Sequence, residues 1–157
     1  MSSPVKVEHI NPFISATVET FKSMLSTAVT PGKLMLIKGN KLQSDISGII
    51  GLSGGAKGSV ILSFPRISAL KTVSQFIGEK VVTMDETVKD AIGELANIVA
   101  GAAKKDLTAY KISISLPTVI IGDNHEVQGG KDVIPMAVPF ESPFGLFYLV
   151  VSFKSEG

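Results

Sequence analysis

Asp90, Glu94 and Asn97 are the residues of this sequence whose types and spacing best suit chemistry. Steps of four and then three residues place the three side chains on one face of a helix, one above another. At about 100° per residue, that face points away from the apolar Ile92 and Leu95, so we expect it to be exposed. An amide donates and accepts hydrogen bonds but takes no proton at neutral pH, so Asn97 would orient a reactant rather than act as a base. A solvated helix face without any chemistry explains the same pattern.

Other catalytic signatures are missing from the sequence. It contains no G-x-S-x-G elbow, no Walker loop and no H-E-x-x-H helix, and the lysine in the glycine-rich stretch 54–58 is not followed by serine or threonine. Neither His9 nor His125 has a second histidine at ligand spacing, and we expect His125, in the polar stretch 122–126, to be a solvated loop residue. Without cysteine there is no disulfide, thiolate metal site or cysteine nucleophile. No set of residues at metal-ligand spacing is therefore evident.

The composition is that of a core-rich chain. Of its 157 residues, 45% are hydrophobic and 18% are charged, with a formal net charge of +1. This length predicts a single domain, residues 1–157, and the low charged fraction favours an oligomer interface, because an average soluble protein has roughly 25% charged residues. The balanced charge argues against nucleic-acid binding. Neither a signal-peptide pattern nor an apolar run of the ~20 residues that span a bilayer is found, so we expect a cytoplasmic protein without membrane insertion.

Hydrophobic periodicity predicts three helices, over residues 7–29, 66–77 and 86–107. The third carries the polar triad, and Thr83 with Glu86 has the form of a capping box at its start. Turns rich in glycine separate the predicted strands, which cover residues 33–38, 45–52, 59–64, 112–121, 132–140 and 145–153.

The two halves of the chain resemble each other. Each reads as a helix followed by three strands, and the last strands, Gly58-Ser-Val-Ile-Leu-Ser-Phe64 and Gly145-Leu-Phe-Tyr-Leu-Val-Val-Ser-Phe153, share their first and last residue types. We infer a duplication with the 66–77 helix inserted between the copies, although apolar hairpins also resemble one another by chance. The predicted fold class is α/β of the α+β type. Two helix–strand–strand–strand pseudo-repeats with an extra helix between them would form a mostly antiparallel sheet covered by helices.

The sequence resembles the CheC/CheX family of chemotaxis phosphatases, and its CheX-like members most. The matching elements are Asp90-x3-Glu94-x2-Asn97, the following Ile98-Val-Ala-Gly-Ala-Ala-Lys104, and the downstream Ser115-Leu-Pro117-Thr-Val. The order of helices and strands also matches, so the resemblance covers nearly the whole chain.

The resemblance implies a substrate, the aspartyl phosphate of a CheY-type response regulator. The resemblance implies Glu94 and Asn97 as the catalytic residues, with Asn97 orienting the attacking water and Glu94 docking the partner; Asp90 would extend the docking surface. The phosphorylated partner would supply Mg²⁺, so the chain would need no cofactor of its own. Pro117 would end or bend a strand beside the helix. The resemblance also implies a homodimer.

The first helix carries a degenerate copy of the motif. Ser15-x3-Glu19-x2-Lys22 occupies the corresponding frame, with lysine in place of the amide. The resemblance therefore implies a single catalytic site, on the later helix.

Two functions of other classes remain open. One is a non-catalytic adaptor of the flagellar or chemotaxis apparatus, because related switch-protein domains share this architecture without an intact motif. The other is a small-molecule sensor domain in which the apolar sheet forms the wall of a pocket.

Overall fold

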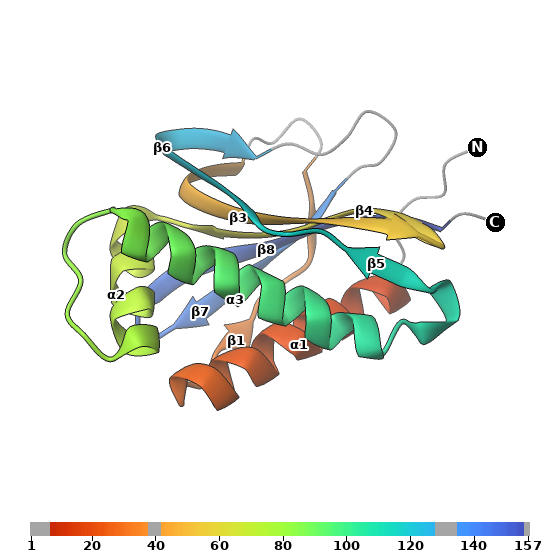
Figure 1. Ribbon diagram of the computed structural model, residues 1–157, viewed down its shortest axis with the longest axis horizontal. Helices are drawn as coiled ribbons and strands as arrows, with labels where there is room; N and C mark the ends of the chain where they lie inside the picture. The colour runs from red at the N-terminus through yellow and green to blue at the C-terminus, as the bar shows by residue number, and fades with distance from the viewer. Residues whose placement is uncertain (1–6, 38–41, 128–134, 156–157) are drawn as a thin grey trace.

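The computed structural model describes residues 7–37, 42–127 and 135–155 (Figure 1). The helices are α1 (Val7–Leu25), α2 (Arg66–Ile77) and α3 (Glu86–Lys105), and a short 3-10 turn, η1 (Thr108–Tyr110), follows α3. No described helix is long and apolar enough to cross a membrane. The strands are β1 (Thr30–Pro31), β2 (Met35–Leu36), β3 (Leu42–Gly54), β4 (Ala56–Phe64), β5 (Ile112–Ile114), β6 (Thr118–Val127), β7 (Met136–Ser142) and β8 (Gly145–Ser155).

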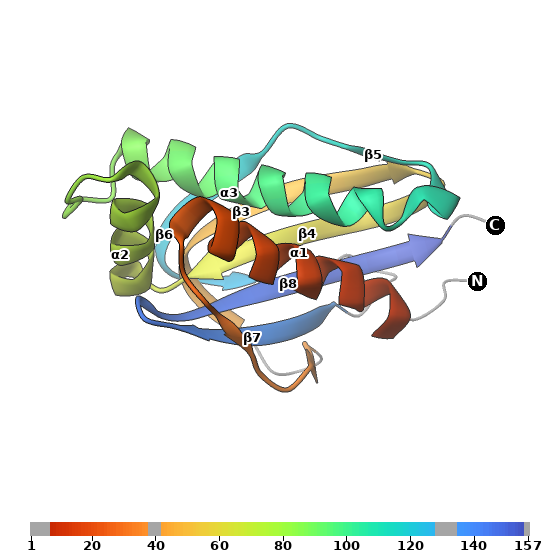
Figure 2. The ribbon, with the colours of Figure 1, turned by 90° about the horizontal axis from the view of Figure 1, so that it is seen from below.

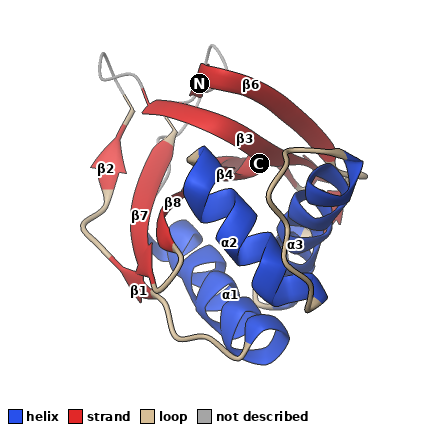
Figure 3. Cartoon of the chain, turned by 90° about the vertical axis from the view of Figure 1, so that its left-hand side faces the viewer, coloured by secondary structure: helices blue, strands red, loops and turns tan. Residues whose placement is uncertain are grey.

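The strands form one sheet in which every described pair is antiparallel. The order is β1-β7-β8-β4-β3-β5, with β2 also paired to β7 and β6 also paired to β3. Helices α1 and α3 run side by side across one face of the sheet, and α2 lies at one end of the molecule (Figures 2 and 3). The predicted fold class, a mostly antiparallel sheet covered by helices, is confirmed.

The sheet is arranged as two similar units around the central pair of β4 and β8. The two strands that share the Ser-Phe pair, β4 and β8, lie against each other, with Gly58 opposite Phe153 and Leu62 opposite Leu149. Strands β3 and β7 flank this pair. The short strands of each half pair with a strand of the other half. β1 and β2 from the first half pair with β7, and β5 and β6 from the second half pair with β3. This exchange agrees with the inferred duplication, and α2 is the helix between the two copies.

The main core lies between the helices and the sheet. The ring of Phe147 on β8 stacks on those of Phe21, Phe64 and Phe140, with centroid distances of 4.7, 5.1 and 5.1 Å. All four side chains are fully buried. Burying one such side chain stabilises a fold by roughly 1.5–3 kcal/mol. This packing fixes α1 on the sheet and gives its outward face a defined position.

A second, smaller hydrophobic cluster lies on the opposite face of the sheet. Side chains alternate along β4, so that Leu62 faces the helices while Ile61 faces the other way. The register between β3 and β6 shifts between Ser44 and Ile46, and both strands curve away from the sheet plane there (Figure 1). The members of this cluster are Leu42, Ile61, Val127, Ala137 and Val150.

Two of the three predicted helices have different ends. The first ends at Leu25 rather than at residue 29, because Ser26 adopts a φ of 50° and the Thr27 N–H then donates to the Phe21 carbonyl at 3.1 Å. The third ends at Lys105 rather than at residue 107. Helix α2 has the predicted bounds, 66–77.

The predicted capping box of α3 is wrong. The N-cap is Asp85, whose carboxylate accepts a hydrogen bond from the Val88 N–H at 3.2 Å. Aspartate is a better N-cap than threonine, and the helix therefore begins at Glu86 with the residue before it as its cap.

Prolines divide two of the predicted strands. Of the region predicted as a strand over 33–38, residue 38 lies outside the described residues, and 33–37 contain only β2. β1 precedes it, and between the two the partner strand β7 presents Pro139, which has no N–H to donate. The predicted strand 112–121 is split into β5 and β6, and Pro117 lies in the gap. The others are found with shifted ends, as 42–54, 56–64, 136–142 and 145–155; residues 132–134 of one prediction lie outside the described residues.

Candidate active site

Helix α3 presents the polar triad on its outward side while its inner side packs into the core. Its close approach to the sheet depends on Gly48 of β3, where an added Cβ would lie 3.1 Å from the Ala96 Cβ and 3.0 Å from the Ile92 carbonyl oxygen. The positive charges of Lys104 and Lys105 in the last turn stabilise the helix, because they lie at the negative, C-terminal end of its dipole. The buried residues of α3 are Val88, Ala91, Ile92, Gly93, Leu95, Ala96, Val99, Ala100 and Ala103.

The three predicted site residues share one open face, here called the α3 face. The side chains of Asp90 and Glu94 are exposed and that of Asn97 is half-buried. In the part of the chain that the structure describes, none of these side chains makes a hydrogen bond or ion pair. One turn after Asn97, a Cβ added at Gly101 would meet nothing within 4 Å. The α3 face is therefore free to receive hydrogen bonds and contacts from a large visiting molecule.

The residues 115–119 border the α3 face. A Cβ added at Gly93, directly before Glu94, would lie 3.1 Å from Val119 Cγ2 and 3.4 Å from Pro117 Cβ. The missing side chain at Gly93 thus lets this segment lie against α3. Pro117 stands at the end of the gap between β5 and β6, as predicted for a proline that interrupts a strand beside the helix.

The degenerate motif lies on the neighbouring helix. Ser15, Glu19 and Lys22 are all exposed on α1, and this surface is here called the α1 face. Helices α1 and α3 pack side by side on the same side of the sheet (Figure 2). The structure thus offers two outward faces of similar pattern, of which only one contains an amide.

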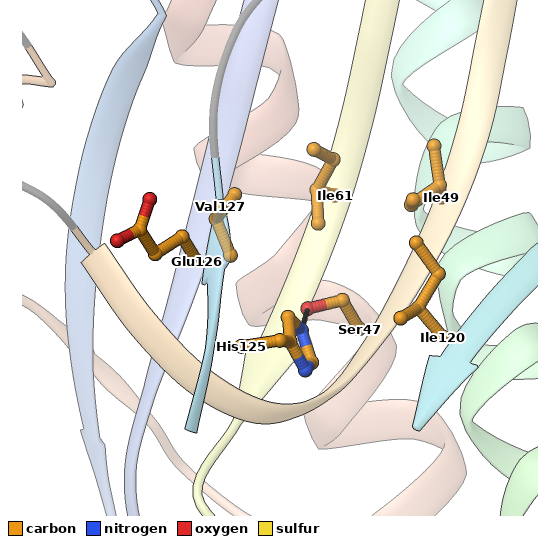
Figure 4. Close-up of a pocket in the computed structure, with 7 residues that line it drawn as sticks. All are labelled: Ser47, Ile49, Ile61, Ile120, His125, Glu126 and Val127. Carbon is orange, nitrogen blue, oxygen red and sulfur yellow. Dashed lines mark hydrogen bonds between the residues drawn. The ribbon is translucent and has the colours of Figure 1, made fainter. Parts of the chain in front are cut away.

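A pocket of about 270 Å³ opens on the sheet face that carries no helix (Figure 4). Its walls are mainly aliphatic, and its polar lining residues are Ser47, His125 and Glu126. Ser47 Oγ and His125 Nε2 are joined by a hydrogen bond of 2.8 Å. The lining residues are Ser47, Ile49, Ile61, Ile120, His125, Glu126 and Val127.

The prediction that His125 is a solvated loop residue is wrong. It belongs to β6 and is half-buried, and its Nδ1 lies 2.8 Å from the Gly122 carbonyl oxygen. Because a carbonyl only accepts, this contact assigns a proton to Nδ1, while Nε2 shares a hydrogen bond with the Ser47 hydroxyl. Ser47 in turn lies 2.7 Å from Ser63 Oγ. No local pattern in the sequence announces these linked hydrogen bonds, because they depend on the register of three strands.

The Ser47–His125 pair resembles a nucleophile with its base, but its surroundings do not suit acyl transfer. Ser47 is only 2% exposed and lies in the middle of the sheet, opposite both Ser63 of β4 and Ile120 of β6. Backbone N–H groups in a central strand are used by the ladders, whereas an acyl-transfer site needs free donors for the oxyanion. We assign the chain of hydrogen bonds a structural role, in which it satisfies buried polar groups where β3 and β6 bend.

Asp45 ties this bend to helix α2. Its carboxylate accepts hydrogen bonds from the Asn124 N–H and from the Arg66 N–H, both at 2.7 Å. These two bonds lower the pKa of Asp45 below its ordinary value of 3.8, and the bond from Asn124 has the larger effect. Since Pro65, the N-cap residue of α2, provides no side-chain hydrogen bond, Asp45 supplies the cap from another strand.

No cluster of three or more histidine, aspartate or glutamate side chains suited to a metal ion occurs within residues 7–37, 42–127 and 135–155. The α3 face itself offers two carboxylates and one amide, all turned toward solvent. Its chemistry is hydrogen bonding and charge pairing with a molecule that arrives from outside.

Comparison with known proteins places these features in a family. Residues 46–141, which include all of α3, match the family model described as Chemotaxis phosphatase CheX. The chain is 31% identical over 153 residues to the CheY-P phosphatase CheX of Thermotoga maritima, covering 94% of this chain and 97% of that protein.

Solved structures of CheX and CheC-like proteins are also similar to this chain. A CheC-like superfamily protein from Shewanella sp. PV-4 is 35% identical with a TM-score of 0.87, covering 98% of this chain and 100% of that one. The CheX chain in a CheX–CheY–BeF₃–Mg²⁺ complex from Borrelia burgdorferi is 26% identical with a TM-score of 0.78, covering 96% and 100%. Because the family model matches and the chain covers almost the whole of the Thermotoga maritima relative, it belongs to the CheX family of chemotaxis phosphatases.

Proposed function

We propose that this protein hydrolyses the aspartyl phosphate of a CheY-type response regulator on the α3 face. The observation that carries the proposal is the open, unpaired triad of Asp90, Glu94 and Asn97 on a helix fixed from beneath by the core. An exposed helix face suits a protein substrate better than a small molecule, since small ligands bind in concave pockets. The family membership and the relatives named for CheY-P phosphatase activity support the same substrate.

Asn97 is proposed to orient the attacking water. An acyl phosphate is already reactive, so the helper protein needs to supply position rather than a strong base. The amide can accept a hydrogen bond from the water and donate another to a neighbouring oxygen, but it cannot remove a proton. Glutamine has a comparable water-positioning role in small GTPases.

Glu94 is proposed to fix the docking register, one turn before Asn97. A carboxylate in this position can pair with a lysine beside the phosphorylated aspartate of the partner. Such a pair becomes desolvated on docking and then contributes more than the 0–1 kcal/mol typical of an exposed ion pair. Asp90, one turn further back, extends the same acidic surface.

The partner is proposed to bring Mg²⁺ with it. The complex from Borrelia burgdorferi is described as containing CheY, BeF₃ and Mg²⁺ together with CheX. The α3 face offers Asp90 and Glu94 as its two carboxylates, four residues apart, and needs no ion of its own to position water through Asn97. A metal held by the regulator would neutralise the phosphoryl oxygens, which leaves this chain to position the water.

We further propose that residues 1–157 act as one domain, as a homodimer in the cytoplasm. The low charged fraction supports a second copy as a partner. So does β6, which pairs only with β3 among the described strands and exposes Ile120 and Ile121 at 44% and 42%. Size-exclusion chromatography with light scattering tests the oligomeric state.

The decisive experiment compares wild type with Asn97→Ala in the decay of a phosphorylated CheY-type regulator. We expect wild type to accelerate decay and the variant to leave it at the regulator's own rate, while both bind the regulator. Because Asn97 is half-buried on the helix surface, the substitution leaves the core intact. A full-rate Asn97→Ala protein would remove the water-orienting role. Wild type without any acceleration would instead favour the adaptor.

The pocket on the sheet face that carries no helix favours the sensor alternative, since its walls are mainly aliphatic. Native mass spectrometry tests this alternative directly. A metabolite retained by wild type and lost by an Ile61→Trp variant that fills the pocket would support it.

A further inference from the structure

Leu116 is the most exposed large hydrophobic residue in the described part of the chain, at 86%. Single exposed leucines are common on protein surfaces and need no explanation by themselves. The backbone that carries Leu116 is unusual, however, because residues 115–117 belong to no strand and yet are held from both sides.

Ser115 fixes the segment to β3. The Ser115 N–H donates to the Gly51 carbonyl at 2.9 Å, and the Gly51 N–H donates to Ser115 Oγ at 2.8 Å. The Ser115 hydroxyl donates in turn to the Leu116 carbonyl at 2.8 Å. The residue before Leu116 is thus bound to the sheet through both its backbone and its side chain.

Pro117 fixes the other side. Its ring locks its own φ and restricts Leu116 to extended conformations. The ring also lies against α3 at Gly93, where an added Cβ would be 3.4 Å from Pro117 Cβ and 3.5 Å from Pro117 Cγ. The leucine therefore stands in solvent on a backbone whose conformation is already set. A side chain presented in this way loses less entropy on binding than one on a mobile loop.

The place of Leu116 connects it to the α3 face. Gly93, against which Pro117 lies, directly precedes Glu94 and stands one turn before Asn97. The surface thus combines an exposed apolar side chain with carboxylates and an amide, as in interfaces where apolar contact is surrounded by polar groups. Continuity with the α3 face indicates that whatever docks on Glu94 also covers Leu116.

We propose that Leu116 is a docking residue that inserts into an apolar hollow on the regulator, beside its phosphorylated aspartate, and thereby helps to select the regulator. This inference rests on the proposed function. Leu116 has no hydrogen-bonding group, so it cannot stabilise charge that develops during hydrolysis. It binds substrate and transition state alike, and such uniform binding acts on KM rather than on kcat.

The test is Leu116→Ser, measured as phosphate release over a range of phosphorylated regulator concentrations. We expect KM to rise about tenfold, the effect of losing one buried leucine contact, and kcat to stay within about twofold. Saturating regulator restores the rate, and Leu116→Met keeps KM near that of wild type. The matched control is Leu36→Ser, because Leu36 is 49% exposed on β2 at the opposite edge of the sheet. This control leaves KM unchanged.

The outcomes separate this inference from the function on which it rests. If wild type is active and Leu116→Ser keeps the KM of wild type, the docking role is overturned and the phosphatase function stands. If wild type is inactive, the phosphatase function fails, and titration calorimetry with the phosphorylated regulator decides the docking role alone. Equal affinity of wild type and Leu116→Ser overturns it, whereas tenfold weaker binding by the variant supports it.

Discussion

The α1 face and the α3 face have the same arrangement on neighbouring helices but differ in their polar residues. Both lie on helices whose apolar stripes pack into the same core, and both place a glutamate on the outward side, Glu19 on one and Glu94 on the other. They differ where α3 has Asn97 and α1 has Lys22. An ammonium group donates hydrogen bonds but accepts none, so Lys22 cannot hold a water from both sides as an amide can.

The flanks of the two faces differ as well. At the position of Gly93 in α3, counted from the motif, α1 has Val18. Gly93 lets the segment 115–119 lie against α3, and a valine in its place would push that segment away. The amide of α3 therefore belongs to a surface in which the neighbouring segment also has to fit. A proposed catalytic face is thus defined by its borders as much as by its polar residues.

The largest expected effect comes from exchanging the two differing residues. In a Lys22→Asn, Asn97→Lys double variant, the amide moves to α1, but the border formed by Gly93 and Pro117 stays on α3. We expect at least a hundredfold loss of phosphatase rate, measured by decay of the phosphorylated regulator, because the moved amide lacks its docking surface. Both positions lie on helix surfaces, so circular dichroism and Tm should stay near those of wild type. Recovery of a tenth or more of the wild-type rate would show that the amide alone distinguishes the two faces.

A smaller effect distinguishes the two glutamates. Glu94→Gln removes the charge that we propose to pair with the partner, and we expect KM to rise about tenfold, since a desolvated charge pair contributes a few kcal/mol at most. The matched variant Glu19→Gln removes an exposed carboxylate from the same place on α1 and should leave KM unchanged. Steady-state phosphate release at low and high salt measures both. Equal behaviour of the two variants would mean that the partner does not distinguish the faces.

Local patterns predicted the fold class and the α3 face, because helical spacing and apolar alternation are written in neighbouring residues. The exposure of Asp90 and Glu94 follows from the positions of Ile92 and Leu95 on the same helix. Even here the pattern favours Thr83 rather than Asp85 as the cap, since several polar residues before a helix can serve and only the backbone conformation decides.

Contacts between distant strands could not be predicted. Ser47 and His125 are 78 positions apart and meet because β3 and β6 shift register at a bulge, which no local pattern announces. Likewise Leu116 reads as one more apolar residue in a strand-like stretch. Its exposure follows from Pro117 and from the bonds of Ser115 to Gly51, which interrupt the strand.

The smallest expected effect concerns α2, the helix between the two similar halves of the chain. Asp45 accepts N–H bonds from Asn124 and from Arg66 at the start of α2, and an asparagine has one acceptor oxygen and could keep only one of them well. We expect Asp45→Asn to lower the free energy of unfolding by about 1 kcal/mol, as for the loss of an N-cap, and Tm by about 2–4 °C.

Because these bonds lower the pKa of Asp45, its contribution is complete above its ordinary pKa of 3.8 and is lost as pH falls through the lower pKa of the folded state. Urea unfolding from pH 7 to pH 3 should therefore show the difference between wild type and variant shrinking only at the acid end. Phosphatase activity at pH 7 should stay within about twofold of wild type, since the carboxylate supports neither α1 nor α3. A difference that persists undiminished at pH 3 would contradict the capping role, and a large loss of activity would show that α2 positions the α3 face after all.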